Sequence, residues 1–217
     1  MNKEIRNLTN SEAEIRAIKD SRRVDGYGIV FNSESRDLGG FSEIISPDSL
    51  NGIIENKGTD ILALLNHNED RGLLARYRNG GGTLSLTVDE KGLKYAFDSP
   101  NTNLGDEVLE GINRGDISTS SFAFRVAPNG EKWEKRDDGS YLRTITAFAD
   151  IFDVSPVYKE AYSDTTVAKR SMAELRKEEI PPEVKEPVEP PVEKKSSFKD
   201  LTEHYAELEK QINELNK

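Results

Sequence analysis

The chain has no cysteine and only two histidines among its 217 residues. Without cysteine it cannot form disulfides, use a thiolate nucleophile or bind zinc through sulfur, and it suits a reducing compartment. One histidine, His204, lies in the C-terminal tail, so the preceding part of the chain has His67 alone. His67 is therefore either a catalytic base or a purely structural residue.

Long apolar runs and basic blocks are also missing. No stretch of about 18 apolar residues and no cleavable signal occurs, so we expect a soluble, intracellular protein with no membrane partner. The formal net charge is −10. A nucleic-acid binder needs a basic surface to displace counterions from phosphates. The acidic composition therefore argues against nucleic acid as the main partner.

The segment that is rich in structure signals runs from residue 26 to residue 170. β-Forming residues alternate or cluster at 26–32, 60–67, 73–78, 83–89, 92–98, 118–127, 131–136, 141–148 and 149–157. Ser46 and Pro47 indicate a short helix to about residue 55, and Leu104, Val108 and Ile112 predict a helix over 103–113. This pattern predicts one mainly β domain with an antiparallel meander and a few helices.

Both ends of the chain differ from this domain. Residues 1–25 are polar with scattered apolar positions, and could form a first strand or a loosely attached arm. Residues 171–196 include the stretch 181–191, which holds five of the nine prolines, and predict an extended linker. In 197–217, the apolar residues from Phe198 to Leu215 recur at spacings of 3 and 4, which predicts a short amphipathic helix that needs a partner surface.

A serine-rich strand offers a nucleophile. In the strand predicted at 118–127, alternation puts Ser120 with Phe122 and Phe124 on the core face. Ser121 falls on the other face, which we expect to be open to a substrate backbone, so Ser121 is the better candidate. A serine hydroxyl needs a base to remove its proton, and His67 is the histidine available.

A carboxylate usually orients such a histidine. Asp153 is our choice because it stands in an apolar strand, where an unpaired charge would be costly. Asp150 is the rival, since it stands at the start of the same segment and could simply be solvated. Each residue also has a structural interpretation, and residues 67–70 could instead form a metal cluster, although one histidine with carboxylates is poor evidence for zinc. We expect no metal and no cofactor.

Ordered blocks give the chain a family resemblance. Residues 26–32, 41–48, 64–67, 115–124 and 153–165 match in order a pattern in tailed-phage prohead maturation proteases of the HK97 type. These serine peptidases are related in fold to the herpesvirus capsid-maturation protease. The resemblance implies an antiparallel β-barrel of that type and a serine endopeptidase.

The resemblance also implies roles for three residues. Ser121 would be the nucleophile, His67 the general base and Asp153 the third member, where the family usually has glutamate. A second histidine in that place, as in the herpesvirus enzymes, is disfavoured because only His204 remains. Ala123 and residues 119–120 depart from the family's usual glycine and Gly-Met, and the oxyanion donors cannot be carried over.

The family's role implies a substrate and a setting. We expect cleavage of the scaffolding region of the major capsid protein, and of the chain itself, inside the assembling procapsid in the host cytoplasm. The linker would be cut by self-processing, and the helix at 198–215 would bind scaffold or other copies of the chain. The alternative is a catalytically inert capsid-assembly scaffold or chaperone module with a coiled-coil tail, or a plain β-barrel binding domain.

Overall fold

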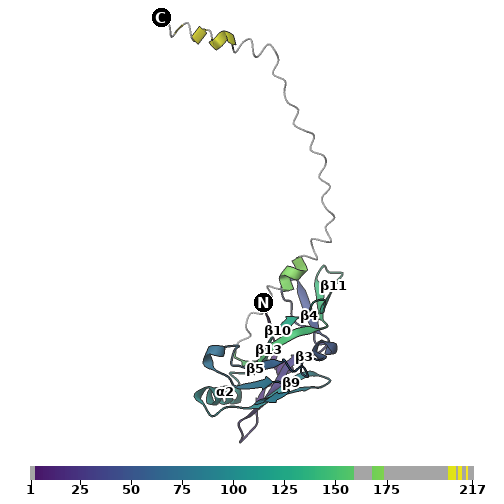
Figure 1. The fold of residues 1–217 in the computed structure, drawn as a ribbon, viewed down its shortest axis with the longest axis vertical. Helices are drawn as coiled ribbons and strands as arrows, with labels where there is room; N and C mark the ends of the chain where they lie inside the picture. The colour runs from purple at the N-terminus through teal and green to yellow at the C-terminus, as the bar shows by residue number, and fades with distance from the viewer. Residues whose placement is uncertain (1–2, 159–167, 174–204, 209, 212–213, 215–217) are drawn as a thin grey trace. The chain divides into compact units, whose positions relative to one another are not determined.

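The structure is a computed structural model that describes residues 3–158, 168–173, 205–208, 210–211 and 214. The chain divides into two compact units, residues 1–176 and 177–217. The first unit holds the sheets of the protein (Figure 1). The described residues of the second unit are helical. Most of the predicted linker, the His204 position and much of the predicted terminal helix lie outside the described residues.

The largest sheet has six strands and carries the candidate site. Its central strands β10 and β13 pair antiparallel, and β13 pairs with β5 in parallel. The sheet consists, in spatial order, of β1 (Glu4–Asn7), β10 (Thr119–Val126), β13 (Phe148–Val157), β5 (Asp60–Ala63), β6 (Ala75–Arg78) and β7 (Gly81–Gly82). Part of the polar N-terminal segment is thus a strand, which lies beside β10 (Figure 1).

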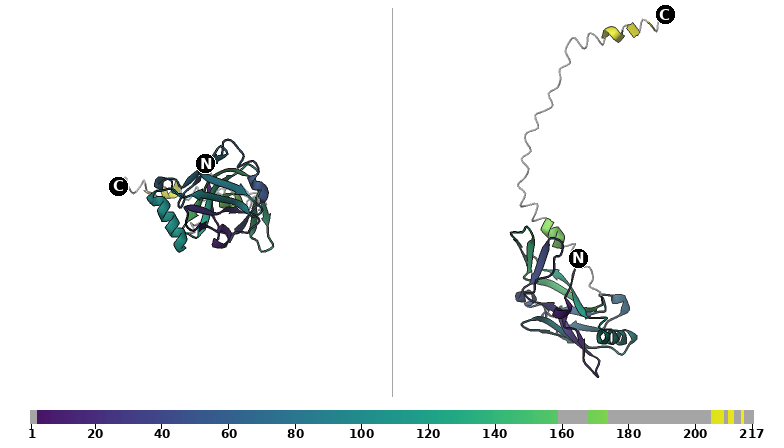
Figure 2. Two further views of the ribbon diagram at one scale, coloured as in Figure 1. Left: turned by 90° about the horizontal axis from the view of Figure 1, so that it is seen from below. Right: turned by 180° about the vertical axis from the view of Figure 1, so that it is seen from behind.

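Two smaller sheets complete the β structure. The four-stranded sheet contains β2 (Arg16–Ala17), β3 (Arg23–Val30), β9 (Gly92–Asp98) and β8 (Leu84–Val88). The three-stranded sheet contains β11 (Glu131–Lys135), β12 (Tyr141–Ile145) and β4 (Phe41–Ile45). Figure 2 shows these strands from two further sides.

Among the residues that the structure describes, the helices are few and short. The longest, α2 (Asn103–Arg114), begins where the Thr102 side chain accepts a hydrogen bond from the Gly105 amide, and ends at Gly115 in the left-handed conformation. The others in this unit are α1 (Asn10–Ala13), the 3₁₀ helices η1 (Pro47–Leu50) and η2 (Glu69–Arg71), and residues 168–173. The helix predicted to reach residue 55 is thus a single 3₁₀ turn.

The prediction of a mainly β fold with a few helices is confirmed, but the prediction of a closed antiparallel barrel is wrong. Each sheet in the described part of the chain runs from one edge strand to another without closing. The pairs β13–β5 and β12–β4 are parallel, and a meander of hairpins cannot produce parallel neighbours. Long crossovers therefore build these sheets.

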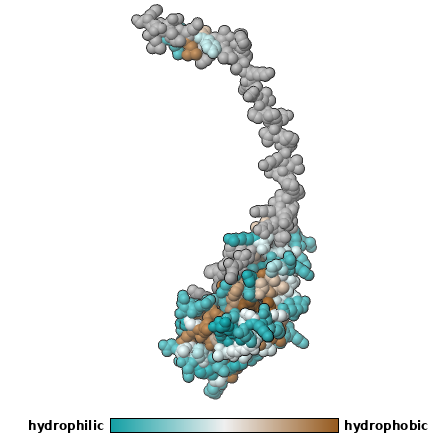
Figure 3. All heavy atoms as spheres, viewed as in Figure 1, coloured by the Kyte–Doolittle hydropathy of each residue, from teal (hydrophilic) through white to brown (hydrophobic). Residues whose placement is uncertain are grey.

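One large apolar cluster lies beneath the six-stranded sheet. Phe122 and Phe124 of β10 are fully buried in it and stack with ring centroids 5.0 Å apart, as the alternation of the strand predicted. Phe148 meets Phe124 edge to face. Polar side chains cover much of the surface visible in Figure 3, with apolar side chains between them. The aromatic face of β10 thus fixes which way its serines point.

Candidate active site

His67 lies in a turn after β5, not in the strand where the sequence predicted it. The strand ends at Ala63, and Asn66 and His67 both have left-handed backbones, with φ of 54° and 57°. The backbone N–H of Asn66 donates to the Pro156 carbonyl (3.0 Å). The side-chain oxygen of Asn66 accepts from the backbone N–H of Tyr158 (3.2 Å). These bonds attach the turn to the end of β13.

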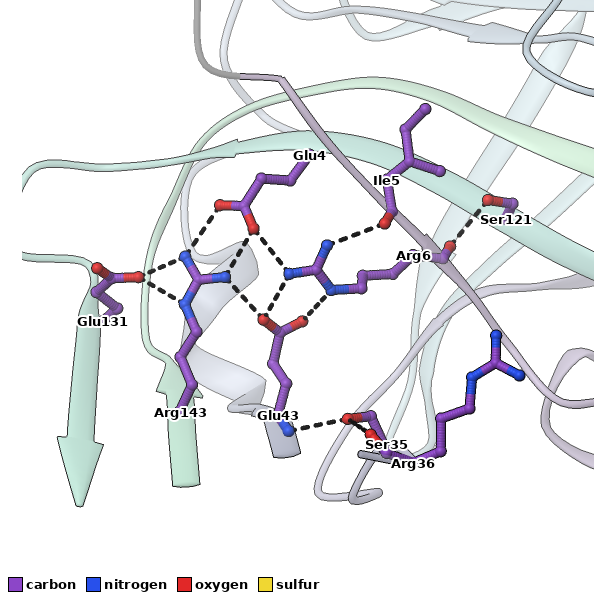
Figure 4. A network of polar contacts seen from close by, with 9 residues as sticks. All are labelled: Glu4, Ile5, Arg6, Ser35, Arg36, Glu43, Ser121, Glu131 and Arg143. Atoms are coloured by element: carbon purple, nitrogen blue, oxygen red, sulfur yellow. Dashed lines mark hydrogen bonds and ion pairs between the residues drawn. The ribbon is translucent and has the colours of Figure 1, made fainter. Parts of the chain in front are cut away.

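Ser121 stands in β10, with Asn7 of β1 on one side and Ser155 of β13 on the other. Its Oγ lies 2.7 Å from Nε2 of His67. The hydroxyl also lies 2.9 Å from the backbone carbonyl of Arg6, to which it can donate (Figure 4). Because a hydroxyl has one proton, it can donate either to the imidazole or to this carbonyl, but not to both at once.

Asp153 stands behind the imidazole ring. Its Oδ1 lies 2.5 Å from Nδ1 of His67 and accepts a 2.6 Å hydrogen bond from the Ser155 hydroxyl. Its Oδ2 is 3.4 Å from Nζ of Lys3. Asp153 pairs with Ala123 in the same regular register in which Ser155 pairs with Ser121, so both lie beside the serine strand. The register shifts directly after this pair, and such bulges are common next to active sites.

The environment of Asp153 favours its ionised form. Burial raises the pKa of the carboxyl, but the hydrogen bond and charge of His67, the hydroxyl of Ser155 and the charge of Lys3 together outweigh it. The pKa of Asp153 therefore lies below its ordinary value. An ionised carboxylate at this position can hold the Nδ1–H tautomer of His67 and stabilise the imidazolium.

The rival residues lie elsewhere. Ser120 faces the core, where its hydroxyl is 2.8 Å from that of Tyr95. Asp150 forms a partly exposed ion pair with Arg125. The structure therefore brings together His67, Ser121 and Asp153 rather than either rival.

Ser121 is not on an open face, contrary to the sequence expectation. Its exposed fraction is 0%, and the His67 side chain is only 10% exposed. Alternation predicts which face of β10 carries a side chain, but not what packs on that face, and here the His67 ring lies against Ser121. The hydroxyl of Ser121 is thus enclosed in the described structure.

A buried charge cluster fastens β1 in this place (Figure 4). Arg6 donates to Glu4 (2.7 Å) and Glu43 (2.9 Å), and Arg143 donates to the same two carboxylates (2.7 and 2.8 Å). Arg143 also pairs with the less buried Glu131. The cluster joins β1 of the large sheet to β4, β11 and β12, so it holds the Arg6 carbonyl beside Ser121.

Sequence reasoning missed Ser155, Lys3 and the backbone of Arg6 as neighbours of the site. A signal existed for Ser155, because it stands two residues after Asp153 in the same strand and thus shares its face. The contacts of Lys3 and Arg6 depend on the pairing of β1 with β10, for which the local sequence offered no signal.

The metal alternative finds no support in the described residues. Within these ranges, no group of three or more His, Cys, Asp or Glu side chains is arranged to hold a metal ion. Nor does the described part contain a helix long and apolar enough to cross a membrane.

Comparisons with known proteins give the family. The structure of the bacteriophage T4 capsid assembly protease matches with a TM-score of 0.39 and 10% identity, over 72% of this chain and 98% of that one. No curated protein sequence matches the chain. The family model for the caudovirus prohead serine protease matches residues 11–178, well over half of the chain. The chain therefore belongs to the caudovirus prohead serine protease family.

Proposed function

We propose that the chain is a serine endopeptidase in which Ser121 is the nucleophile, His67 the general base and Asp153 the group that orients the base. The observation that carries this proposal is one continuous line of contacts. Oγ of Ser121 lies 2.7 Å from Nε2 of His67, and Nδ1 of the same ring lies 2.5 Å from Oδ1 of Asp153. Three separate elements supply these residues, and the distances suit proton transfer.

The reaction proceeds in two halves. Oγ of Ser121 attacks the scissile carbonyl while its proton passes to Nε2 of His67, and the imidazolium then gives this proton to the leaving amine. Water next attacks the acyl-enzyme and transfers a proton to Nε2. His67 returns that proton to Oγ as the acid product leaves. Throughout the cycle, Asp153 accepts the Nδ1–H bond and stabilises the transient positive charge.

The family and the match to a capsid assembly protease support a capsid protein as the substrate. We place the cleavage in the scaffolding region of the major capsid protein, inside the procapsid in the host cytoplasm, as in the HK97-type enzymes that the sequence resembles. Co-expression with the cognate capsid protein tests this assignment. Wild type should shorten the capsid protein, whereas Ser121→Ala should leave it intact.

The matched control is Ser120→Ala, which removes a buried hydroxyl from the same strand but on the core face. This variant should still process the capsid protein. If Ser121→Ala processes it as well as wild type does, the protease assignment is rejected, and an inert assembly module becomes the better interpretation.

The chain itself is a second proposed substrate, with the cut in the Pro-rich linker at 171–196. Intact masses of wild type and Ser121→Ala test this idea, because only wild type should lose its C-terminal part. Equal full-length masses would reject it. We also propose that residues 198–215 bind scaffold or further copies of the chain, so deleting them should lower the amount of enzyme in purified proheads.

A further inference from the structure

The carboxylate of Asp153 is shared among three partners. Its Oδ1 meets Nδ1 of His67 at 2.5 Å and the Ser155 hydroxyl at 2.6 Å, while Oδ2 faces the Lys3 ammonium at 3.4 Å. Oδ1 of Asp153 therefore accepts from two donors, the Nδ1–H of His67 and the hydroxyl of Ser155. The orientation of this oxygen determines where the imidazole ring lies.

Ser155 is built into the sheet at this point. It follows Asp153 by two residues in β13, shares its face, and pairs across the ladder with Ser121 itself. Its side chain is fully buried. A buried hydroxyl must have a hydrogen-bond partner, and the partner here is the carboxylate oxygen that contacts His67.

Two donors that reach one oxygen from different directions restrict the rotation of the carboxylate. The ring of His67 comes from the turn after β5, whereas the hydroxyl of Ser155 comes from the strand of Asp153 itself. With the ring alone as a partner for Oδ1, the carboxylate could turn about its Cβ–Cγ bond. Misplacement by about 1 Å can cost on the order of 100-fold in rate.

We propose that Ser155 is a positioning residue: its hydroxyl fixes Oδ1 of Asp153, and through it the imidazole of His67, in line with Ser121. This inference rests on the proposed function. The hydroxyl of Ser155 donates to Asp153, so we expect it to act through that carboxylate. The hydroxyl also helps to keep the pKa of Asp153 low against the effect of burial, so its loss raises that pKa.

Covalent labelling of Ser121 by a fluorophosphonate probe tests the proposal without a known peptide substrate. The second-order rate is followed by intact mass at one fixed pH, for wild type and for Ser155→Ala, Ser155→Thr, Ser120→Ala and Ser121→Ala. Ser155→Ala should react on the order of 10- to 100-fold more slowly.

The remaining variants separate positioning from a general packing effect. Ser155→Thr keeps the hydroxyl and should recover most of the rate, and Ser120→Ala should match wild type. A wild-type rate for Ser155→Ala would overturn the proposal. Labelling of Ser121→Ala at the wild-type rate would instead reject the proposed function.

A spectroscopic measurement covers the case in which Ser155→Thr packs poorly. The chain has two histidines, so a His204→Gln background leaves His67 as the single source of an imidazole N–H resonance. In this background Ser155→Ala should shift or broaden the Nδ1–H signal, while Ser120→Ala should leave it in place. An unchanged signal in Ser155→Ala would also overturn the proposal.

Discussion

His67 and Asn66 both hold a left-handed backbone that non-glycine residues rarely adopt. Such conformations cost about 1–3 kcal/mol each and persist where the surroundings fix them. Here the Asn66 amide is bonded to the Pro156 carbonyl, and the His67 ring lies between Ser121 and Asp153. The strained turn thus brings a residue that follows β5 into contact with both β10 and β13.

The two candidate acids can be separated by substitution. Asp153→Asn replaces the carboxylate behind His67 with an amide that neither stabilises the imidazolium nor enforces the right tautomer. Capsid-protein cleavage should fall on the order of 10⁴-fold. Asp150→Asn breaks only a partly exposed pair with Arg125 and should keep near wild-type activity. Rates from time courses with purified proteins give the comparison, and the reverse ranking would contradict the assignment.

Among the elements, α2 shows how local signals determine a helix. Leu104, Val108 and Ile112 predicted it, and Thr102 caps its first turn. Thr102→Ala should lower the free energy of unfolding by about 1 kcal/mol, because the Gly105 amide loses its acceptor. Thr102→Ser keeps the oxygen and should remain within a few tenths of wild type in urea denaturation. Equal stability of the alanine variant and wild type would contradict the capping role.

The position of strand β1 is instead stabilised by ion pairs with residues far away in the sequence. Glu43→Gln should destabilise the protein by about 3–5 kcal/mol, because Arg6 and Arg143 lose a shared counter-charge in a buried place. The matched control is Glu107→Gln, which removes an exposed pair with Arg71 and should change stability little. Urea denaturation measures both variants. Similar small effects for the two would show that the cluster does not stabilise the fold.

Local patterns predicted most strands and α2, but not how the strands pair. β-Forming residues indicated β10, β11, β12 and β13 close to their observed positions. The parallel pairs β13–β5 and β12–β4 join segments far apart in the chain, so no local signal marks them. Glu43 and Arg143 resemble ordinary surface charges in sequence, and only the tertiary fold buries them together.

At the scale of the whole molecule, the sequence indicated which three residues lie together in the candidate site, but not how deeply they are buried. His67, Ser121 and Asp153 were chosen as the chemically suited residues on predicted strands, and the structure places them in contact. Their catalytic roles stay predictions. The burial of Ser121 could not be foreseen, because it depends on the three-dimensional arrangement around β10.

The stability of the whole fold should depend on pH through its buried carboxylates. Burial raises the pKa of Glu4, but its hydrogen bonds to Arg143 and Arg6 and the charges of these two residues outweigh the effect of burial. The pKa of Asp153 is likewise lowered by its partners. Groups with lowered folded-state pKa values stabilise the protein above their unfolded pKa values of about 4, and this contribution is lost as pH falls through the folded values.

The free energy of unfolding should therefore stay nearly constant from pH 7 to about pH 5 and then decline as the solution becomes more acidic. Urea titrations at several pH values give the curve. Glu4→Gln should be less stable at neutral pH and show a shallower acid decline, since one linked group is gone. A wild-type stability that does not fall below pH 4 would contradict this linkage.

The enclosed hydroxyl of Ser121 has a kinetic consequence. If the described state dominates in solution, only the minor fraction of molecules with an accessible Oγ can react, and the observed rate is the intrinsic rate multiplied by that fraction. Each 1.4 kcal/mol required for opening reduces turnover about tenfold. Conditions that favour the open form would then accelerate cleavage without changing any catalytic group. The observed rate would therefore report the fraction of molecules in the open form.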